Sequence, residues 1–362
     1  MADLVHNRER LREICLSPTA LLQDAVDTID RHPLRITLVV DEAGRLAGTV
    51  TDADLRRAML GNLPTSAGID NVMNRAPTVA TTQMTRAEQA ALLRRSRHRH
   101  LPLTDQTGVL LDLLTLPTKR QGETRDNWVV LMAGGAGTRL RPLTEHTPKP
   151  LLQVGRKPIL EQILERFVDQ GFHLFFLAVH YKEAMVRAHF GCGRRWGVEI
   201  RYLREDRARG TAGALSLLPA GNSCPVVVMN GDLLTNLDFR ELLAFHEDGA
   251  APATMCVREY GHSIPYGVVR AEGMRLKSID EKPVQTFFVN AGIYVLAPAL
   301  ISRIPSHRPY DMPELFTDLA ARSPAPSLFP IREYWLDIGQ LDDYKRANAE
   351  FAATFSPPDL TL

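Results

Sequence analysis

The stretch that decides the fold is Leu131–Thr144, LMAGGAGTRLRPLT, which directly follows the apolar run Trp128–Val130. Glycines placed just after a buried strand let backbone N–H groups approach phosphate oxygens with no side chain in the way. A Walker A loop would continue with Gly-Lys-Ser or Gly-Lys-Thr, whereas Gly137 is followed by a Thr-Arg pair. A dinucleotide fingerprint would need a third glycine where this sequence has Leu140. The loop therefore follows neither of these two phosphate-binding patterns.

Two cationic side chains follow the glycines in the sequence. Arg139 comes directly after the loop, and Lys149 stands between Pro148 and Pro150, which stiffen the backbone on both sides of it. A guanidinium offers phosphate a planar fork of donors, and an ammonium offers a compact charge. The pattern predicts a loop that holds phosphates at the end of the strand.

Further short motifs follow in order along the chain. They are Gly210–Ala214 (GTAGA), Asn230–Asp232 (NGD), Glu281–Pro283 (EKP), Asn290–Tyr294 (NAGIY) and Trp335–Gly339 (WLDIG). Together with the glycine-rich loop and the PKPLL segment after it, they resemble the motifs of the sugar nucleotidyltransferases, the NDP-sugar pyrophosphorylases. The resemblance extends from about Trp128 to Phe351.

This resemblance implies a reaction between a nucleoside triphosphate and a sugar 1-phosphate that yields an NDP-sugar and pyrophosphate. A phosphate oxygen of the sugar attacks the α-phosphorus in line, so catalysis depends on bringing anions together and stabilising their charge. The sugar phosphate is already ionised. The resemblance therefore implies neither a nucleophilic side chain nor a general base.

The resemblance also implies roles for the residues that match the family's motifs. The residues expected to act on the reacting phosphates are Arg139, Lys149 and Lys282. The nucleotide is expected to contact Ala133, Gly134, Gly135, Gly137, Thr138, Thr211, Ala212 and Gly213. The sugar is expected to contact Glu281, Asn290, Gly292 and Tyr266. The residues expected to hold Mg²⁺, which suits carboxylates combined with phosphate oxygens, are Asp232 and Asp337.

Simpler structural roles stay open for some of these residues. Asp232 follows the apolar run Val226–Met229, which places it at the carboxyl end of a strand, where open α/β sheets bind ligands. An aspartate beside a glycine is also typical of a turn. Glu281–Pro283 could be the polar end of a hairpin, and Tyr266 could be a core residue.

The resemblance is strongest to a bacterial guanylyltransferase subgroup that supplies GDP-sugars, notably GDP-glucosamine, for nonulosonate surface glycans. It implies GTP with glucosamine 1-phosphate or a related hexose 1-phosphate. UTP or dTTP with glucose 1-phosphate is the first alternative, since Arg209 stands before Gly210 where Leu or Met is usual. The second alternative is a nucleotide-sensing protein whose transferase domain is inactive.

A repeat with a spacing of 64 residues occupies the first third of the chain, because Asp41, Gly44 and Thr51 recur as Asp105, Gly108 and Thr115. Each copy is predicted to form a helix followed by two strands joined at an Asp/Gly turn. Two such units can bury apolar faces that one alone would expose.

The repeat resembles a pair of CBS motifs. Thr51 and Asp54 match that family's ribose-binding Thr-x-x-Asp, which implies an adenine nucleotide on the first copy. The second copy has Thr118 where the aspartate should be, so at most one such site is expected. One alternative is that Thr51 and Asp54 only cap a helix. The other is that the module binds no ligand and joins two chains as a homodimer.

Strands and helices alternate after residue 128, which predicts a mainly parallel, Rossmann-like α/β sheet, the GT-A-like fold that the resemblance also implies. We expect a CBS-pair module over residues 1–120, a linker over 121–127 within the polar stretch Pro117–Asn127, and a catalytic domain over 128–362.

The charge balance and the cysteines restrict the classes of partner. With 43 basic and 42 acidic side chains, the chain gives no reason to expect nucleic acid or an anionic membrane. No apolar run approaches the ~18 residues of a membrane span. The basic run Arg94–His100 is expected to be a solvated helix end, with a nucleotide phosphate contact as the alternative. The four cysteines lie far apart, so free thiols and a cytoplasmic location are expected.

Overall fold

The structure is a computed structural model that describes residues 3–4, 8–95, 100–115, 124–249 and 251–355. The chain divides into two compact units, Met1–Arg120 and Gln121–Leu362, which we call the N-terminal and the C-terminal unit. Residues 121–123 of the expected linker lie outside the described residues, as do residues 96–99 of the basic run. The first strand of the C-terminal unit begins at Arg125, so Arg125–Asn127, expected in the linker, belong to that strand.

The N-terminal unit contains the predicted repeat. Its elements are β1 (Asp3–Leu4), α1 (Arg8–Glu13), β2 (Cys15–Leu16), α2 (Leu22–Arg31), β3 (Ile36–Val40), β4 (Leu46–Thr51), α3 (Asp52–Leu60), η1 (Ile69–Asn71), β5 (Ala80–Thr81), α4 (Arg86–Arg95), β6 (His100–Thr104) and β7 (Leu110–Thr115). They form one sheet of order β2-β3-β4 and another of order β1-β7-β6-β5. The hairpins β3–β4 and β6–β7 have equivalent registers and a bulge at the same place.

The same turn chemistry shapes both hairpins. One carboxylate oxygen of Asp41 accepts from the backbone N–H groups of Ala43 (2.9 Å) and Arg45 (2.8 Å). Asp105 does the same two and four residues ahead. Gly44 and Gly108 follow with φ of +77° and +83°, a conformation that glycine adopts without steric cost. The two turns also hydrogen-bond to each other, which joins the copies.

The C-terminal unit begins with the strand that precedes the glycine-rich loop. Its elements are β8 (Arg125–Met132), η2 (Thr138–Leu140), η3 (Lys149–Leu151), β9 (Gln153–Val154), β10 (Lys157–Pro158), α5 (Ile159–Asp169), β11 (Phe172–Val179), α6 (Glu183–Phe190), η4 (Arg194–Trp196), β12 (Glu199–Arg204), η5 (Gly213–Leu217), β13 (Val226–Asn230), β14 (Leu233–Thr235), α7 (Phe239–Gly249), β15 (Ala253–Ser263), β16 (Gly267–Glu272), β17 (Arg275–Glu281), β18 (Val284–Leu296), α8 (Pro298–Ile301), α9 (Met312–Ala320), β19 (Ser327–Ile331), β20 (Trp335–Asp337) and α10 (Leu341–Phe355).

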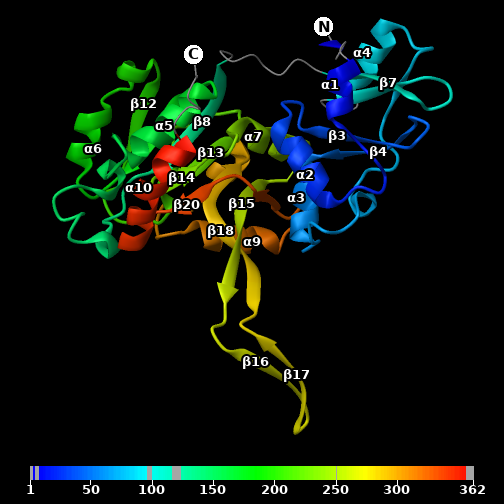
Figure 1. Cartoon of the computed structure of the whole chain (residues 1–362). Helices are drawn as coiled ribbons and strands as arrows, with labels where there is room; N and C mark the ends of the chain where they lie inside the picture. The colour runs from blue at the N-terminus through cyan, green and yellow to red at the C-terminus, as the bar shows by residue number, and fades with distance from the viewer. Residues whose placement is uncertain (1–2, 5–7, 96–99, 116–123, 250, 356–362) are drawn as a thin grey trace. The chain divides into compact units, whose positions relative to one another are not determined.

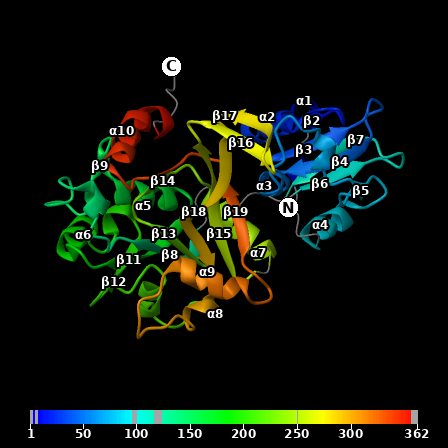
Figure 2. The same cartoon turned by 90° about the horizontal axis from the view of Figure 1, so that it is seen from below.

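A seven-stranded sheet of order β12-β11-β8-β13-β18-β15-β19 organises this unit. Strands β12, β11, β8 and β13 are mutually parallel, and β18 alone runs against its neighbours. The expected mainly parallel α/β fold is confirmed. Helices α5, α6, α7 and α10 pack on one face, and η5, α8 and α9 pack on the other. Figure 2 shows α5 and α10 on one side of the sheet and α8 and α9 on the opposite side.

Strands β15 and β18 continue beyond the sheet as a two-stranded ribbon that carries the hairpin β16–β17 at its end. We call residues Glu259–Val289 the arm. Figure 1 shows the arm running away from the sheet, with β16 and β17 at its tip.

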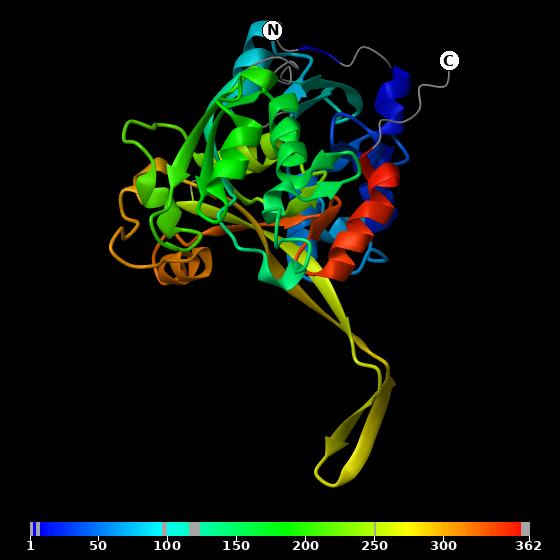
Figure 3. The same ribbon diagram turned by 90° about the vertical axis from the view of Figure 1, so that its left-hand side faces the viewer.

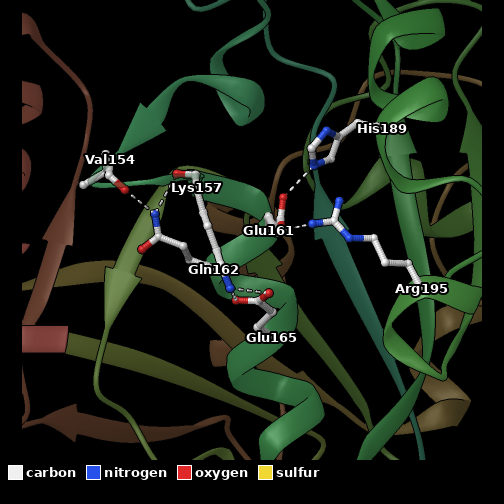
Figure 4. A network of polar contacts seen from close by, with 7 residues as sticks. All are labelled: Val154, Lys157, Glu161, Gln162, Glu165, His189 and Arg195. Atoms are coloured by element: carbon white, nitrogen blue, oxygen red, sulfur yellow. Dashed lines mark hydrogen bonds and ion pairs between the residues drawn. The ribbon is translucent and has the colours of Figure 1, made fainter. Parts of the chain in front are cut away.

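Polar side chains of α5 fix the elements around it (Figure 4). The buried carboxylate of Glu161 lies 2.7 Å from His189 Nε2 of α6 and accepts from Arg195 Nη2 over 3.1 Å. Gln162 Nε2 donates to the carbonyl of Val154 (2.8 Å) and so holds the β9–β10 hairpin. This hairpin comes directly after the segment that contains Lys149, so α5 helps to place that segment.

Among the described residues, no helix is long and apolar enough to cross a membrane.

We predict that Glu161→Gln lowers the free energy of unfolding of the C-terminal unit by about 1–3 kcal/mol, because it removes the buried charge that pairs with Arg195 and hydrogen-bonds to His189. Glu199→Gln is the control, since Glu199 and Arg201 are both half exposed and their ion pair should contribute less than about 1 kcal/mol. Urea unfolding followed by tryptophan fluorescence measures the effect on this unit alone. The three tryptophans, all in the C-terminal unit, are Trp128, Trp196 and Trp335. Equal effects of the two substitutions would contradict this prediction.

Candidate active site

The carboxyl ends of four neighbouring parallel strands meet at one edge of the sheet, which is where open α/β sheets bind ligands. The glycine-rich loop leaves β8 at this edge, and Asp232 follows β13. His180 and Glu205 come directly after β11 and β12. Sheet topology therefore gathers residues from four separate stretches of sequence.

The glycine-rich loop has the conformation that its glycines allow. Gly137 has φ of +60°, and a Cβ there would lie 2.9 Å from Thr144 Cγ2 and 3.1 Å from Lys149 Cβ. Thr144 Oγ1 donates to the Gly137 carbonyl over 2.8 Å. Gly135 is exposed, and no atom lies within 4 Å of the position where its Cβ would be. The loop thus packs against Lys149 on one side and leaves its backbone open at Gly135.

Lys149 and Asp232 form an ion pair at this edge. The lysine side chain is buried, and one carboxylate oxygen of Asp232 accepts from its Nζ. The backbone N–H of Gly231 donates to the Met132 carbonyl over 2.9 Å, and a Cβ at Gly231 would lie 2.4 Å from that oxygen. This close approach of β13 to β8 brings Asp232 beside the loop.

A second carboxylate, Asp337, reaches the same place through the pairing of β14 with β20. Leu233 stands opposite Asp337 in that pair, and the N–H of Ile338 donates to the Asp232 carbonyl over 3.1 Å. Although the Asp337 side chain is partly exposed, surrounding protein displaces water and raises its pKa to about 6, and the charge of Asp232 contributes. The cations Lys149 and Arg139 act in the opposite direction.

These two carboxylates fit a hard divalent cation. The second oxygen of Asp232, Oδ1, is buried and has no hydrogen-bond partner, an arrangement that is costly unless something binds it. Repulsion between two adjacent carboxylates raises a carboxyl pKa, and a bound cation would relieve this repulsion. No group of three or more His, Cys, Asp and Glu side chains in the described part of the chain is arranged to hold a metal ion. Further ligands would therefore have to come from water or substrate phosphates.

Arg139 lies close to Asp337, beside Gly339. Its Nη1 is 3.7 Å from the position of a Cβ at Gly339, and that same position is 3.8 Å from Asp337 Oδ1. Four of the predicted residues, Arg139, Lys149, Asp232 and Asp337, are thus gathered around the loop.

The predicted nucleotide segment, Gly210–Ala214, is hydrogen-bonded to the start of α9. The N–H of Gly213 donates to the Tyr310 carbonyl over 2.7 Å. The N–H of Thr211 donates to Asp311 Oδ1 over 2.8 Å, and its hydroxyl accepts from the N–H of Met312 over 2.9 Å. The Thr211 hydroxyl is therefore committed to local structure, and any nucleotide contact from this segment falls to its backbone.

Glu205 is a site residue that the sequence did not single out. Its Oε1 is 3.0 Å from the position of a Cβ at Gly134, and its Oε2 accepts from the N–H of Arg209 over 3.0 Å. Burial raises the pKa of this carboxyl. Glu205 thus links the glycine-rich loop to Arg209, just before the predicted nucleotide segment, and its place directly after a strand was the available signal.

Two of the predicted sugar residues lie near Asp232. Gly292 has φ of +71°, and a Cβ there would lie 2.7 Å from Asn230 Nδ2. Asn290 Oδ1 accepts from the N–H of Gly292 (2.9 Å), and its Nδ2 donates to Tyr294 Oη (2.8 Å).

The other predicted sugar residues, Glu281 and Tyr266, and the predicted phosphate ligand Lys282 lie on the arm. All three are exposed, and the Tyr266 side chain is 74% exposed. Lys282 is eight residues from Asn290 along an extended ribbon, which corresponds to roughly 25 Å. Within one chain, the structure does not bring these three residues to Asp232.

Thr51 and Asp54, the predicted adenosine ligands, lie together at the start of α3 in the N-terminal unit. The N–H and hydroxyl of Thr51 donate to Asp54 Oδ2 over 2.9 and 2.7 Å, and Arg57 donates to Asp54 Oδ1 over 2.9 Å. This is a helix cap in its present state. Thr118, the divergent position of the second copy, lies outside the described residues.

Comparisons with known proteins agree with this geometry. Residues 128–354 match the family model "Nucleotidyl transferase", and residues 10–61 match "CBS domain". The chain is similar to the mannose-1-phosphate guanyltransferase of Yarrowia lipolytica, at 34% identity over 235 residues, 63% of this chain and 64% of that protein. It is equally similar, at 34% over 235 residues, to the mannose-1-phosphate guanylyltransferase of Mycobacterium tuberculosis, covering 63% of this chain and 65% of that protein. These matches span just under two thirds of the relatives' own length.

Among solved structures, HddC from Yersinia pseudotuberculosis matches with a TM-score of 0.50 and 27% identity, over 62% of this chain and 99% of that one. The residues that match the family model lie in the C-terminal unit. In the N-terminal unit, the second repeat copy, β5-α4-β6-β7, repeats the order β2-α2-β3-β4 found within the CBS match. The chain belongs to the nucleotidyl transferase family and carries a CBS domain over residues 10–61.

Proposed function

We propose that the protein is a sugar-1-phosphate nucleotidyltransferase that condenses a nucleoside triphosphate with a sugar 1-phosphate, releasing pyrophosphate. The observation that carries this proposal is the ion pair of Lys149 with Asp232, with Asp337 beside it, under a glycine-rich loop at the carboxyl edge of the sheet. The relatives with mannose-1-phosphate guanylyltransferase names support it.

In the proposed reaction, a phosphate oxygen of the sugar forms a bond to the α-phosphorus, and the bond from that phosphorus to the β-phosphate oxygen breaks. Lys149 has three donors, of which Asp232 takes one, so the ammonium is held in place while it stabilises charge on the α-phosphate. Arg139 binds the β- and γ-phosphates that leave. The open backbone at Gly135 lets N–H groups approach the phosphates.

We assign Asp232 and Asp337 to a divalent cation, with Mg²⁺ as the proposed ion. When bound, it would neutralise charge on the phosphates and fix their orientation. Asp232 would use the buried oxygen that now has no partner, while its other oxygen keeps Lys149. Loss of the cation would leave two adjacent carboxylates facing the incoming phosphates, which disfavours binding.

GTP is the proposed nucleotide. Guanine presents N1–H and N2–H₂ donors on its Watson–Crick edge, and a carboxylate can accept from both. The half-buried carboxylate of Glu205 lies between the loop and Arg209, just before the predicted nucleotide segment, and the base is proposed to bind beside it. UTP and dTTP offer only one donor on the same edge.

The proposed sugar is a hexose 1-phosphate, with glucosamine 1-phosphate and mannose 1-phosphate as the compounds to compare. The product would be an activated donor for glycan synthesis, made in the cytoplasm, where GTP is available. The domain boundaries proposed for this activity are 1–120 for the CBS module and 125–362 for the catalytic domain. Thr51 and Asp54 would exchange their mutual hydrogen bonds for the hydroxyls of an adenine nucleotide that regulates the enzyme.

The metal assignment predicts that the native protein binds Mn²⁺, used as a paramagnetic probe for Mg²⁺, and that Asp232→Asn weakens this binding at least ~10-fold. Asp337→Asn should act in the same direction. Asp342→Asn is the matched control, because that side chain is 93% exposed in α10. Electron paramagnetic resonance of free Mn²⁺ measures the binding, and unchanged affinity in Asp232→Asn would refute the assignment.

The reaction assignment predicts pyrophosphate release in a matrix of four nucleoside triphosphates against several sugar 1-phosphates, with GTP preferred. Asp232→Asn should lower kcat/KM at least ~100-fold, whereas Asp342→Asn should leave it unchanged. If pyrophosphate release is no higher than in buffer alone for every pair of nucleotide and sugar 1-phosphate, the chain is not this enzyme. A preference for UTP or dTTP would overturn the assignment of GTP but would leave the proposed reaction class unchanged.

The base assignment predicts that Glu205→Gln lowers the ratio of kcat/KM for GTP to that for UTP by ~10-fold or more, because one guanine donor loses its acceptor. Glu199→Gln, at the far end of the same strand, is the control. Equal losses for both nucleotides would mean that Glu205 supports the loop without reading the base.

A further inference from the structure

The arm, Glu259–Val289, contains no buried residue, although all of it is described. Its tip is the two-stranded sheet β16–β17. An isolated hairpin of this kind is marginally stable in water, because two strands cannot bury an apolar face between them. The arm therefore needs a surface to lie on.

The hairpin has one apolar and one polar face. Val269 and Ile279 are direct cross-strand partners and are 60% and 56% exposed. Leu276 continues this face beyond the bulge and is 63% exposed. The opposite face carries Arg270, whose Nε donates to Asp280 over 2.8 Å. An antiparallel sheet with this alternation usually packs its apolar face and exposes the polar one.

Glu281 and Lys282 stand where the hairpin joins the ribbon. Glu281 is on the apolar face, since a Cβ at its partner Gly267 would lie 2.8 Å from Glu281 Oε2. Lys282 has φ of +47°, a conformation that is costly for a residue with a side chain and is usually retained at functional positions.

The ribbon between these residues and the sheet is continuous. Strand β18 pairs with β15 from Leu296 to Val284, and the bonds Ile264 N–H to Pro283 carbonyl (3.0 Å) and Lys282 N–H to Tyr266 carbonyl (3.3 Å) extend the ladder. Figure 1 and Figure 3, seen from perpendicular directions, both show the arm running away from the helices of its own unit. This ladder holds the arm extended from the sheet to Lys282.

We propose that the arm docks on a second copy of this chain and places Glu281 and Lys282 in that copy's active site. The site of each chain lacks these two groups, and the arm of each chain carries them beyond its own reach. Exchange of the same element between two copies gives a closed, two-fold interface. Burial of Val269, Leu276 and Ile279 would provide the stabilisation. The role of Lys282 on the sugar phosphate rests on the proposed function.

Mixing two inactive variants tests this proposal. In Asp232→Asn the core is defective and the arm intact, and in Lys282→Ala the reverse holds. A mixed dimer then combines one intact core with one intact arm. Re-associated at equal amounts, the variants should recover about a quarter of native pyrophosphate release, since half of random dimers are mixed and each has one complete site. Mixed dimers isolated with two affinity tags but without activity would overturn the proposal, as would full activity of Lys282→Ala alone.

Sedimentation of the full chain tests the interface without any activity. The native protein should be a dimer, and Ile279→Asp should shift it toward monomer at least ~10-fold in dissociation constant. Ser278→Asp adds the same charge on the opposite face beside Arg270 and should leave the dimer intact. If the native protein is a monomer, the arm does not dock on a second copy. Equal effects of the two substitutions would refute the docking of this face as well. A dimer with no pyrophosphate release would reject the proposed function while keeping the interface.

Discussion

The rest of the C-terminal unit depends on one constraint. The ammonium of Lys149 and the carboxylates of Asp232 and Asp337 are held close together at the carboxyl edge of one sheet. A buried ion pair contributes little net stability, because desolvation offsets much of the attraction. Lys149 and Asp232 are therefore better understood as groups kept in position for a charged ligand. The close contact of Gly231 with Met132, the packing of Gly137 on Lys149 and the β14–β20 pairing all serve that placement.

The sheet divides its tasks between two halves. The parallel strands β12, β11, β8 and β13 end at one edge and supply the glycine-rich loop, Glu205 and Asp232. The antiparallel strand β18 passes close to Asp232 at Gly292 and then leaves the sheet with β15 as the arm. Reversal of one strand thus connects the reaction centre to an exposed apolar hairpin. This is why the proposed interface and the proposed sugar contacts can lie on the same arm.

Much of this could be predicted from the sequence, because the deciding residues are local. The loop and Asp232 each follow a strand with a clear apolar run, and Lys149 stands between two prolines. The spacing of 64 residues located both copies of the repeat. The expected linker ended three residues too late, since Arg125–Asn127 look polar although they belong to β8, which pairs with β11. Glu205 was missed because a charged residue after a strand is equally typical of a solvated turn. The direction of the arm was also beyond prediction, since alternation specifies strands and not where a ribbon points.

In the proposed reaction, this edge of the sheet catalyses direct transfer by positioning the phosphates, with no covalent link to a side chain. The most direct measurement is the stereochemical course at the α-phosphorus, followed with GTP that carries sulfur in place of one α-oxygen. A single in-line displacement by the sugar phosphate predicts inversion of configuration. Retention would require two displacements through a nucleophilic side chain, and it would contradict a reaction in which Lys149, Asp232 and Asp337 only position and neutralise the phosphates.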